Sequence, residues 1–282
     1  MKTKLERSDV RRDEQINFHI YGVTISIRAE KISQLEEVYR QLGKVFPHGM
    51  EKYDGRRIEF RFSISWTKNG GYELYRNDEK LMGISNRTLF FEAVESQIRL
   101  TIAEFARAKV FLHAGVVGWK NRAIVIPARS FSGKSTLVAE LIKKGAVYYS
   151  DEYAVLDVDG NVQPFPRWLS IRSKTPPFAQ TDQPVESFGA VAGTVAIPVG
   201  LILIAKYDGK KKTPLRWQPK RLSGGQGMME ILPHTMPIRN KPKFVLGVLN
   251  KLVNRAIIVK TVRGEAAEFA ETLLNYFEYQ TP

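Results

Sequence analysis

Residues 133–136 read Gly-Lys-Ser-Thr, a group of side chains that could bind the phosphates of a nucleotide. Residues 128–136 match the phosphate-loop pattern G-x-x-x-x-G-K-[ST], except that Ala128 replaces the first glycine. A glycine at the second position lets the backbone turn its N–H groups toward phosphate oxygens. We therefore expect a nucleotide site here, and the alternative is a glycine-containing turn between a strand and a helix. The expected cofactor-binding residues are Ser130, Ser132, Gly133, Lys134, Ser135 and Thr136.

The flanking residues have the patterns of the elements that such a loop needs. Residues 123–126 are a short β-branched apolar run, typical of a buried strand. After the loop, Leu137, Val138, Leu141 and Ile142 recur at helical spacing, so the loop opens into a helix whose N-terminus faces the anion. We expect Lys134 to reach the β- and γ-phosphates of ATP and the Ser135 hydroxyl to bind Mg²⁺.

Two further candidates lie on neighbouring predicted strands. Residues 146–150 predict a strand that ends at Asp151 and Glu152, where an acidic side chain would meet Mg²⁺ or an attacking hydroxyl. His113 lies on a predicted strand over residues 111–119 that leads into the 123–126 strand. From the residues alone, a core histidine is the preferred interpretation of His113. Glu152 is equally well explained as a solvated turn residue or as a residue that assists a metal ion.

Composition limits the class of protein. With 43% hydrophobic and 26% charged residues, the 282-residue chain has the composition of a soluble globular protein. It has no cysteine, which excludes thiolate catalysis, and no apolar run of bilayer-spanning length, so a cytoplasmic location is expected. The net charge of +14 favours an anionic partner, but no basic motif interleaved with aromatic residues points to nucleic acid.

The hydrophobic pattern divides the chain into two parts. Residues 1–107 predict a small α+β module with an antiparallel sheet and a linking helix, and residues 108–282 predict a larger α/β nucleotide-binding domain. Residues 175–193 are rich in Pro, Ser, Gln and Gly and predict a flexible loop near the active face. Further predicted elements are strands at 17–27, 57–66, 72–75, 168–171, 195–205 and 256–262, a hairpin at 153–165, and helices at 30–46, 86–108, 223–232, 244–254 and 265–279.

Residues 113–117, 128–136, 141–145 and 150–152 occur in an order and at intervals that resemble the catalytic domain of HPr kinase/phosphorylase. The resemblance covers about residues 108–282. It implies a phosphoenolpyruvate-carboxykinase-like α/β core, in which a P-loop lies between the strands of a mixed sheet. The chain is most similar to divergent members of that family, including lasso-peptide tailoring kinases, so HPr itself is not the expected acceptor.

The resemblance also implies roles. Lys134 would bind phosphates, Ser135 would bind Mg²⁺, and Asp151, paired with His113, would take the proton from the acceptor hydroxyl. Asp151 and Glu152 would be further metal ligands. Three departures stand out: Ala128 in the loop, Glu152 in place of a second Asp, and an N-terminal module unlike the family's own. The family's later signature for the phosphorylase reaction is not matched.

The expected function is therefore an ATP- and Mg²⁺-dependent kinase acting on a hydroxyl, most simply a Ser of a peptide or protein. Two alternatives stay open, namely a small-molecule kinase and an ATP-binding regulatory protein that transfers nothing. Homo-oligomerisation is also left open. Arg216, Arg239 and Lys243, which lie in or near basic stretches at 206–221 and 239–243, are candidates for stabilising charge in the transition state.

Overall fold

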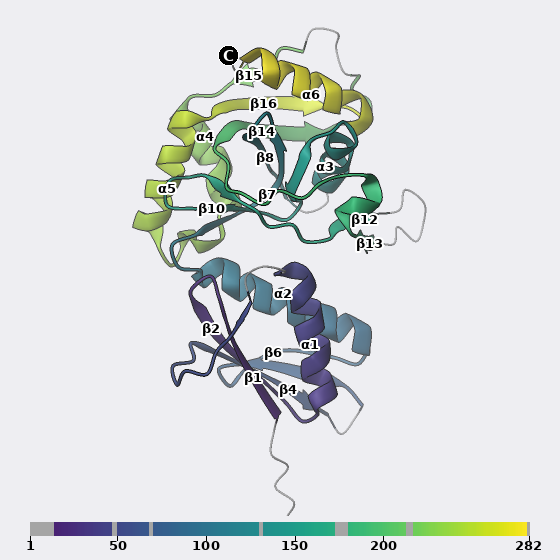
Figure 1. Ribbon diagram of the computed structural model, residues 1–282, viewed down its shortest axis with the longest axis vertical. Helices are drawn as coiled ribbons and strands as arrows, with labels where there is room; N and C mark the ends of the chain where they lie inside the picture. The colour runs from purple at the N-terminus through teal and green to yellow at the C-terminus, as the bar shows by residue number, and fades with distance from the viewer. Residues whose placement is uncertain are drawn as a thin grey trace, which may run out of the picture. The chain divides into compact units, whose positions relative to one another are not determined.

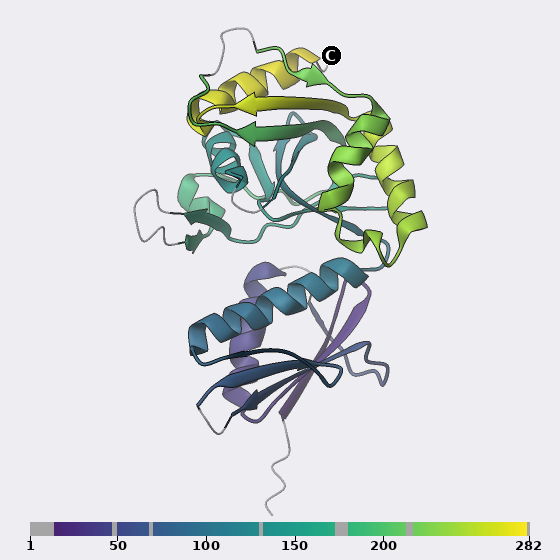
Figure 2. The same ribbon diagram turned by 180° about the vertical axis from the view of Figure 1, so that it is seen from behind.

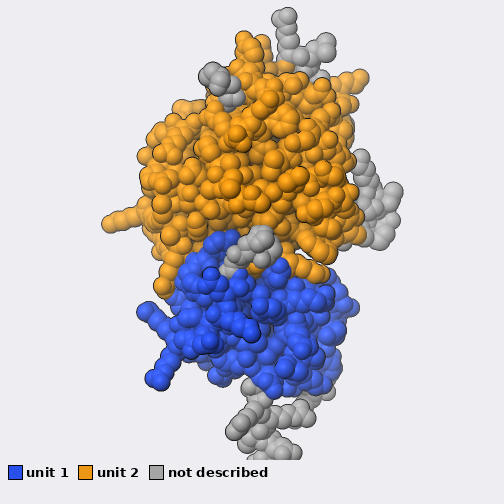
Figure 3. Space-filling view, in the orientation of Figure 1, with its two compact units in different colours: residues 1–43, 48–99 blue, residues 44–47, 100–282 orange. Residues whose placement is uncertain are grey.

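The computed structural model describes residues 14–46, 50–67, 70–129, 132–172, 180–212 and 217–280. The chain forms two compact units, which Figure 3 colours separately: residues 1–43 with 48–99, and residues 44–47 with 100–282. The division falls inside helix α2 (Arg87–Phe105). The boundary at residue 107 stays a prediction about independently folding domains. No helix in the described ranges is both long and apolar enough to cross a membrane.

The first unit is a six-stranded sheet with two helices. The strand order is β3-β1-β2-β4-β5-β6, and the helices are α1 (Ile32–Val45) and α2. The expectation of an antiparallel sheet is wrong at one pair, because β2 and β4 run parallel. The strands are β1 (Glu14–Ile20), β2 (Val23–Ala29), β3 (Glu51–Lys52), β4 (Phe60–Trp66), β5 (Tyr72–Arg76) and β6 (Glu79–Ile84).

Tight turns account for what the sequence pattern missed in this unit. The single strand expected at residues 17–27 is a hairpin, because Tyr21 and Gly22 both take positive φ angles, 47° and 82°. Asn77 and Asp78 form a similar turn, with φ of 47° and 69°, and lead into the unpredicted strand β6. Two consecutive residues with positive φ are the feature of the turns that join two-residue hairpins.

The second unit is built on a mixed eight-stranded sheet, as predicted. Its order is β11-β10-β7-β8-β14-β16-β15, with β9 also paired to β7. The central strands β8, β14 and β16 are parallel to one another, whereas β7 is antiparallel to β8, β9 and β10. The strands are β7 (Val110–Trp119), β8 (Arg122–Pro127), β9 (Val147–Ser150), β10 (Tyr153–Leu156), β11 (Val162–Gln163), β14 (Val199–Tyr207), β15 (Lys220–Arg221) and β16 (Ile257–Arg263).

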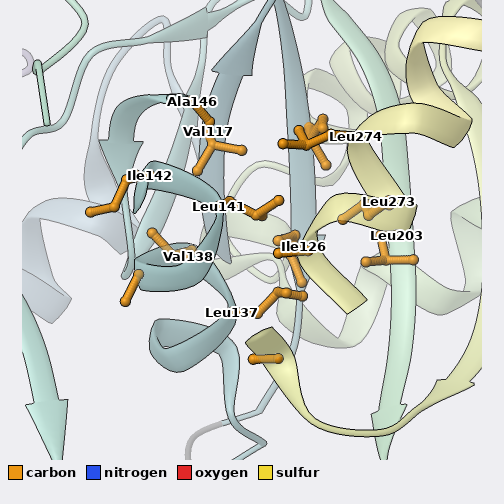
Figure 4. Close-up of a cluster of buried hydrophobic side chains, with 14 of the residues drawn as sticks. Val117, Ile126, Leu137, Val138, Leu141, Ile142, Ala146, Leu203, Leu273 and Leu274 are labelled. Atoms are coloured by element: carbon orange, nitrogen blue, oxygen red, sulfur yellow. The ribbon is translucent and has the colours of Figure 1, made fainter. Parts of the chain in front are cut away.

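Helices cover both faces of this sheet (Figures 1 and 2). Alternation along β8 assigns the faces: Ile124 and Ile126 join one core cluster with α3 and α6, and Ala123 and Val125 join another with α4 and α5. Figure 4 shows the first cluster, in which side chains of α3 and of α6 gather with those of the sheet strands. The helices are α3 (Lys134–Lys143), α4 (Gly224–Ile231), α5 (Pro242–Arg255) and α6 (Ala266–Gln280).

Part of the segment predicted as a flexible loop is ordered. Strand β13 (Gln180–Gln183) pairs with β12 (Leu169–Arg172) in a separate two-stranded sheet. A 3₁₀ helix, η1 (Val185–Phe188), follows and buries Val185. The prediction of a loop over residues 175–193 is therefore wrong for residues 180–188, and residues 173–179 lie outside the described part. The pattern failed because β13 is polar throughout and carries no alternation of hydrophobic residues.

Candidate functional site

The loop between β8 and α3 lies at the edge of the sheet where parallel strands end. Strands β8, β14 and β16 end at Pro127, Tyr207 and Arg263, so these residues belong to the same edge. In open α/β sheets, ligands bind at this carboxyl edge. Ala128, which replaces the expected glycine, is buried and is not among the residues with positive φ. A methyl side chain therefore fits the backbone at that position.

Helix α3 begins at Lys134 with an N-terminus suited to an anion. Gly133 precedes it in the left-handed conformation, with φ of 79°, and no side chain caps the helix. The first turn carries no acidic residue. Uncapped N–H groups and the positive end of the helix dipole favour negative charge here. Ser132 Oγ is buried and has no hydrogen-bond partner in the described part of the chain. A bound ligand could supply that partner.

Lys134 contacts His113 in the structure. Lys134 is 8% exposed, and its Nζ lies 2.8 Å from His113 Nε2. An ammonium group can only donate, so Nε2 accepts in this arrangement and the imidazole proton is assigned to Nδ1. The close approach of β7 to α3 requires Gly115, because a Cβ there would lie 2.7 Å from Val138 and 3.0 Å from Lys134.

Asp151 lies where β9 passes into β10, beside β7. Ser150 Oγ accepts hydrogen bonds from the backbone N–H groups of Glu152 and Tyr153, at 3.1 and 3.0 Å, and so holds the bend between the strands. Ser150 faces Val116 and Tyr153 faces His113 on β7. This bend directs the side chain of Asp151 into the unit, where it is 2% exposed.

Hydrogen-bond donors from the described part of the chain surround the Asp151 carboxylate. They include Ser135 Oγ at 3.0 Å, the Tyr148 hydroxyl at 3.1 Å and the Ser170 backbone N–H at 3.2 Å. His113 contacts Lys134, and its expected pairing with Asp151 stays a prediction. Burial raises the pKa of Asp151 above that of an ordinary carboxyl group, although Arg167 and the hydrogen bonds act against the rise.

Glu152 has a different partner from Asp151. Its carboxylate lies 3.3 Å from Arg167 Nη1, and Arg167 Nη2 lies 3.8 Å from the carboxylate of Asp182. The structure therefore brings Ser135 and Asp151 together and pairs Glu152 with a cation. No cluster of three or more His, Asp or Glu side chains within the described ranges could hold a metal ion by itself.

The oxygen atoms of Ser135 and Asp151 nevertheless suit Mg²⁺. This ion prefers oxygen ligands and is commonly held by one or two carboxylates together with substrate phosphates and water. A hydroxyl and a carboxylate that already lie 3.0 Å apart provide two ligands of the right chemical kind. The residues present therefore fit a magnesium ion that arrives with a nucleotide.

Other predicted site residues are more scattered. Thr136 is exposed on the first turn of α3, and Ser130 and Arg216 lie outside the described residues. Arg239 and Lys243 are exposed around the start of α5. Between them, the ammonium group of Lys241 donates to the carbonyls of Phe105 and Ala106, which gives this basic stretch a structural contact within the second unit.

Sequence reasoning missed several residues around the site. Tyr148 is fully buried, and its hydroxyl lies within hydrogen-bond distance of two acceptors, the Asp151 carboxylate at 3.1 Å and the Arg167 carbonyl at 3.0 Å. His234 ends a short 3₁₀ helix, η2 (Leu232–His234), next to Thr235, which bridges to Leu112 on β7. Burial lowers the pKa of His234, and the charges of Arg129 and Lys134 lower it further. The site therefore has a strongly cationic side, which the isolated residue types could not indicate.

Comparison with solved structures finds several chains that are similar to this one. A solved structure of the HPr(Ser) kinase/phosphatase from Coxiella burnetii is similar with a TM-score of 0.35 and 15% sequence identity, over 60% of this chain and 97% of that chain. No protein-family model matches the chain, and no curated protein matches it.

Proposed function

We propose that this protein is an ATP- and Mg²⁺-dependent kinase that phosphorylates a hydroxyl group, most simply a Ser of a peptide or protein. The observation that carries the proposal is the convergence of two pairs at the start of α3: Lys134 with His113, and Ser135 with Asp151. A lysine at a helix N-terminus suits nucleotide phosphates. A buried carboxylate beside a hydroxyl suits both a metal ion and proton removal.

In this proposal Lys134 and the N–H groups of α3 bind the β- and γ-phosphates. Bound Mg²⁺ would neutralise charge that develops on the phosphate oxygens. Ser135 and Asp151 would hold the ion through their oxygen atoms. Asp151 would also accept the proton of the acceptor hydroxyl as the new P–O bond forms and the bond between the γ-phosphorus and the bridging oxygen breaks, which leaves ADP.

The raised pKa of Asp151 supports its assignment as a base. A carboxyl group with an ordinary pKa is a weak base at neutral pH, and burial brings the value closer to the operating pH. His113 would act through Lys134, because it accepts a hydrogen bond from the ammonium group and so orients it. This is a positioning role on the nucleotide side of the site.

A peptide acceptor is supported by what borders Asp151. The Ser170 N–H that donates to Asp151 belongs to β12, one strand of the two-stranded β12–β13 sheet. An extended peptide can bind by adding a strand to the edge of such a sheet. The net charge of +14 favours an acceptor with acidic residues, whose binding would weaken as salt rises.

The test is phosphoryl transfer to a panel of acceptors. The protein is incubated with Mg²⁺ and ATP and with Ser-containing peptides, acidic and neutral, and with free amino acids and sugars. We expect a mass increase of about 80 Da, one phosphoryl group, on the acidic peptides at low salt. Transfer only to a free metabolite would overturn the peptide assignment. Binding of ATP without transfer to any acceptor would favour the non-catalytic alternative.

A further inference from the structure

Arg263 is a buried cation that contacts the last residue of the loop between β8 and α3, Gly133. It is the last residue of β16 and is 4% exposed. Its Nη2 donates to the Gly133 carbonyl at 2.9 Å, and its Nη1 donates to the Gly264 carbonyl at 2.9 Å. Its guanidinium group lies over the ring of Tyr207, 5.2 Å from the centroid. The end of one parallel strand is thus bonded to the loop that follows another.

No acidic side chain within the described ranges forms an ion pair with Arg263. The nearby carboxylate of Glu265 instead accepts a hydrogen bond from the Tyr207 hydroxyl at 2.6 Å. Burial lowers the pKa of Arg263 from its usual high value, which reports the cost of removing this charge from water. A buried charge without a counter-ion is costly to retain, and a bound anion would offset that cost.

The bond to Gly133 also fixes the orientation of a peptide group. The Gly133 carbonyl accepts from Arg263 and from the Leu137 N–H at 3.1 Å, so its oxygen points along α3. In a trans peptide the C=O and the following N–H point in opposite directions. The N–H of Lys134 therefore points away from the helix, toward the side where an anion would bind.

Position 133 is adapted to this contact. Its φ of 79° favours glycine, and a Cβ there would lie 2.7 Å from Arg263 Nη2. The guanidinium group thus occupies the space that a side chain at position 133 would need. Gly133 of the phosphate-loop pattern and Arg263 of a distant strand are therefore packed directly against each other.

We propose that Arg263 is a positioning residue of the phosphate site, which holds the Gly133–Lys134 peptide in its anion-binding orientation and supplies a positive charge behind the loop. The inference rests on the proposed nucleotide site. It extends that site to a residue on β16 that acts on the bound phosphates through the loop.

The test compares Arg263→Met and Arg263→Lys with the parent and with Arg221→Met. Arg221 is an exposed residue of β15, the neighbouring strand, and serves as the matched control. Binding of Mg²⁺·ATP and of inorganic tripolyphosphate is measured by calorimetry, and thermal unfolding is measured in the same samples. We expect Arg263→Met to weaken binding of both ligands about tenfold or more, Arg263→Lys to recover part of the loss, and Arg221→Met to bind like the parent.

Thermal unfolding distinguishes positioning from general support of the fold. Replacing an unpaired buried charge by an apolar side chain of similar length is often neutral or stabilising, so we expect Arg263→Met to keep the melting temperature of the parent. The inference would be overturned if Arg263→Met bound both ligands as tightly as the parent. It would also be overturned if Arg263→Met lost affinity together with a lowered melting temperature and Arg263→Lys did not recover the affinity. A parent that binds tripolyphosphate but transfers no phosphate would overturn the kinase proposal and leave the inference standing.

Discussion

Lys134 Nζ lies 2.8 Å from His113 Nε2, so the lysine at the start of α3 is oriented by a histidine from the neighbouring strand β7. A Lys side chain has four rotatable bonds and loses much freedom when it is fixed. The contact holds the ammonium group near the N-terminus of α3 before any anion arrives. This arrangement reduces the entropy that a bound phosphate would otherwise have to remove.

Lys134→Ala should weaken the binding of Mg²⁺·ATP about tenfold or more, because the variant lacks the charge that contacts the phosphates. Calorimetry on the parent and the variant measures the effect. Lys143→Ala is the control, because Lys143 lies on the same helix but pairs with Glu140 at the surface. Equal affinity in Lys134→Ala and Lys143→Ala would remove the assignment of the nucleotide site.

His113→Ala should raise the KM for ATP more than it lowers kcat, since the histidine contacts Lys134, the residue assigned to the phosphates. His113→Gln, whose amide oxygen can accept from an ammonium group, should lie between the parent and the Ala variant. Steady-state kinetics with ATP as the varied substrate separates the two constants. A fall in kcat alone would show that His113 acts at the proton-transfer step instead.

Asp151→Asn should lower phosphoryl transfer by about 10²-fold or more while most ATP binding is kept, because an amide cannot accept the hydroxyl proton. Single-turnover kinetics and calorimetry provide the two measurements. Tyr148→Phe is the companion variant, since it removes one hydrogen bond to Asp151 but retains the carboxylate. Transfer at the parental rate in Asp151→Asn would exclude Asp151 as the base.

The raised pKa of Asp151 also predicts how stability depends on pH. The folded protein binds this proton more tightly than the unfolded chain does, so the contribution to the free energy of unfolding is largest below the unfolded value, at pH about 4. It is lost as the pH rises through the folded value. The amide side chain introduced by Asp151→Asn does not titrate, so the variant does not lose this stability. The melting temperature of the variant should therefore increase relative to that of the parent as the pH rises. A difference that is constant with pH would contradict the shift.

The sequence predicted the elements that carry the candidate site better than those around them. Residues 113–151 are close in the chain, and the strand, loop, helix and strand that carry Lys134, Ser135 and Asp151 follow local patterns that can be read directly. The contact of His113 with Lys134 was not predicted, because it depends on how β7 packs beside α3. The bend that Ser150 Oγ holds was not predicted either, because it does not change the periodic pattern of hydrophobic residues.

Long-range contacts account for what was missed. Arg263 was not among the predicted site residues, and nothing in its local sequence indicates Gly133 as its partner. The polar strand β13 was taken for a loop because hydrophobic alternation is absent, and its pairing with β12 was required to reveal it. Features that depend on which strands are adjacent become visible only when the sheet order is known.

The bond between Gly133 and Arg263 joins positions that are 130 residues apart. During synthesis the ribosome therefore releases β8, the loop and α3 well before β16 exists. Long-range pairing forms late because closing a long loop costs entropy. A nascent chain would thus carry Lys134, Ser135 and Asp151 without the cation that orients the loop. If the protein has the proposed function, nucleotide binding would become efficient only when β16 has joined the sheet, and activity would begin only when folding is complete.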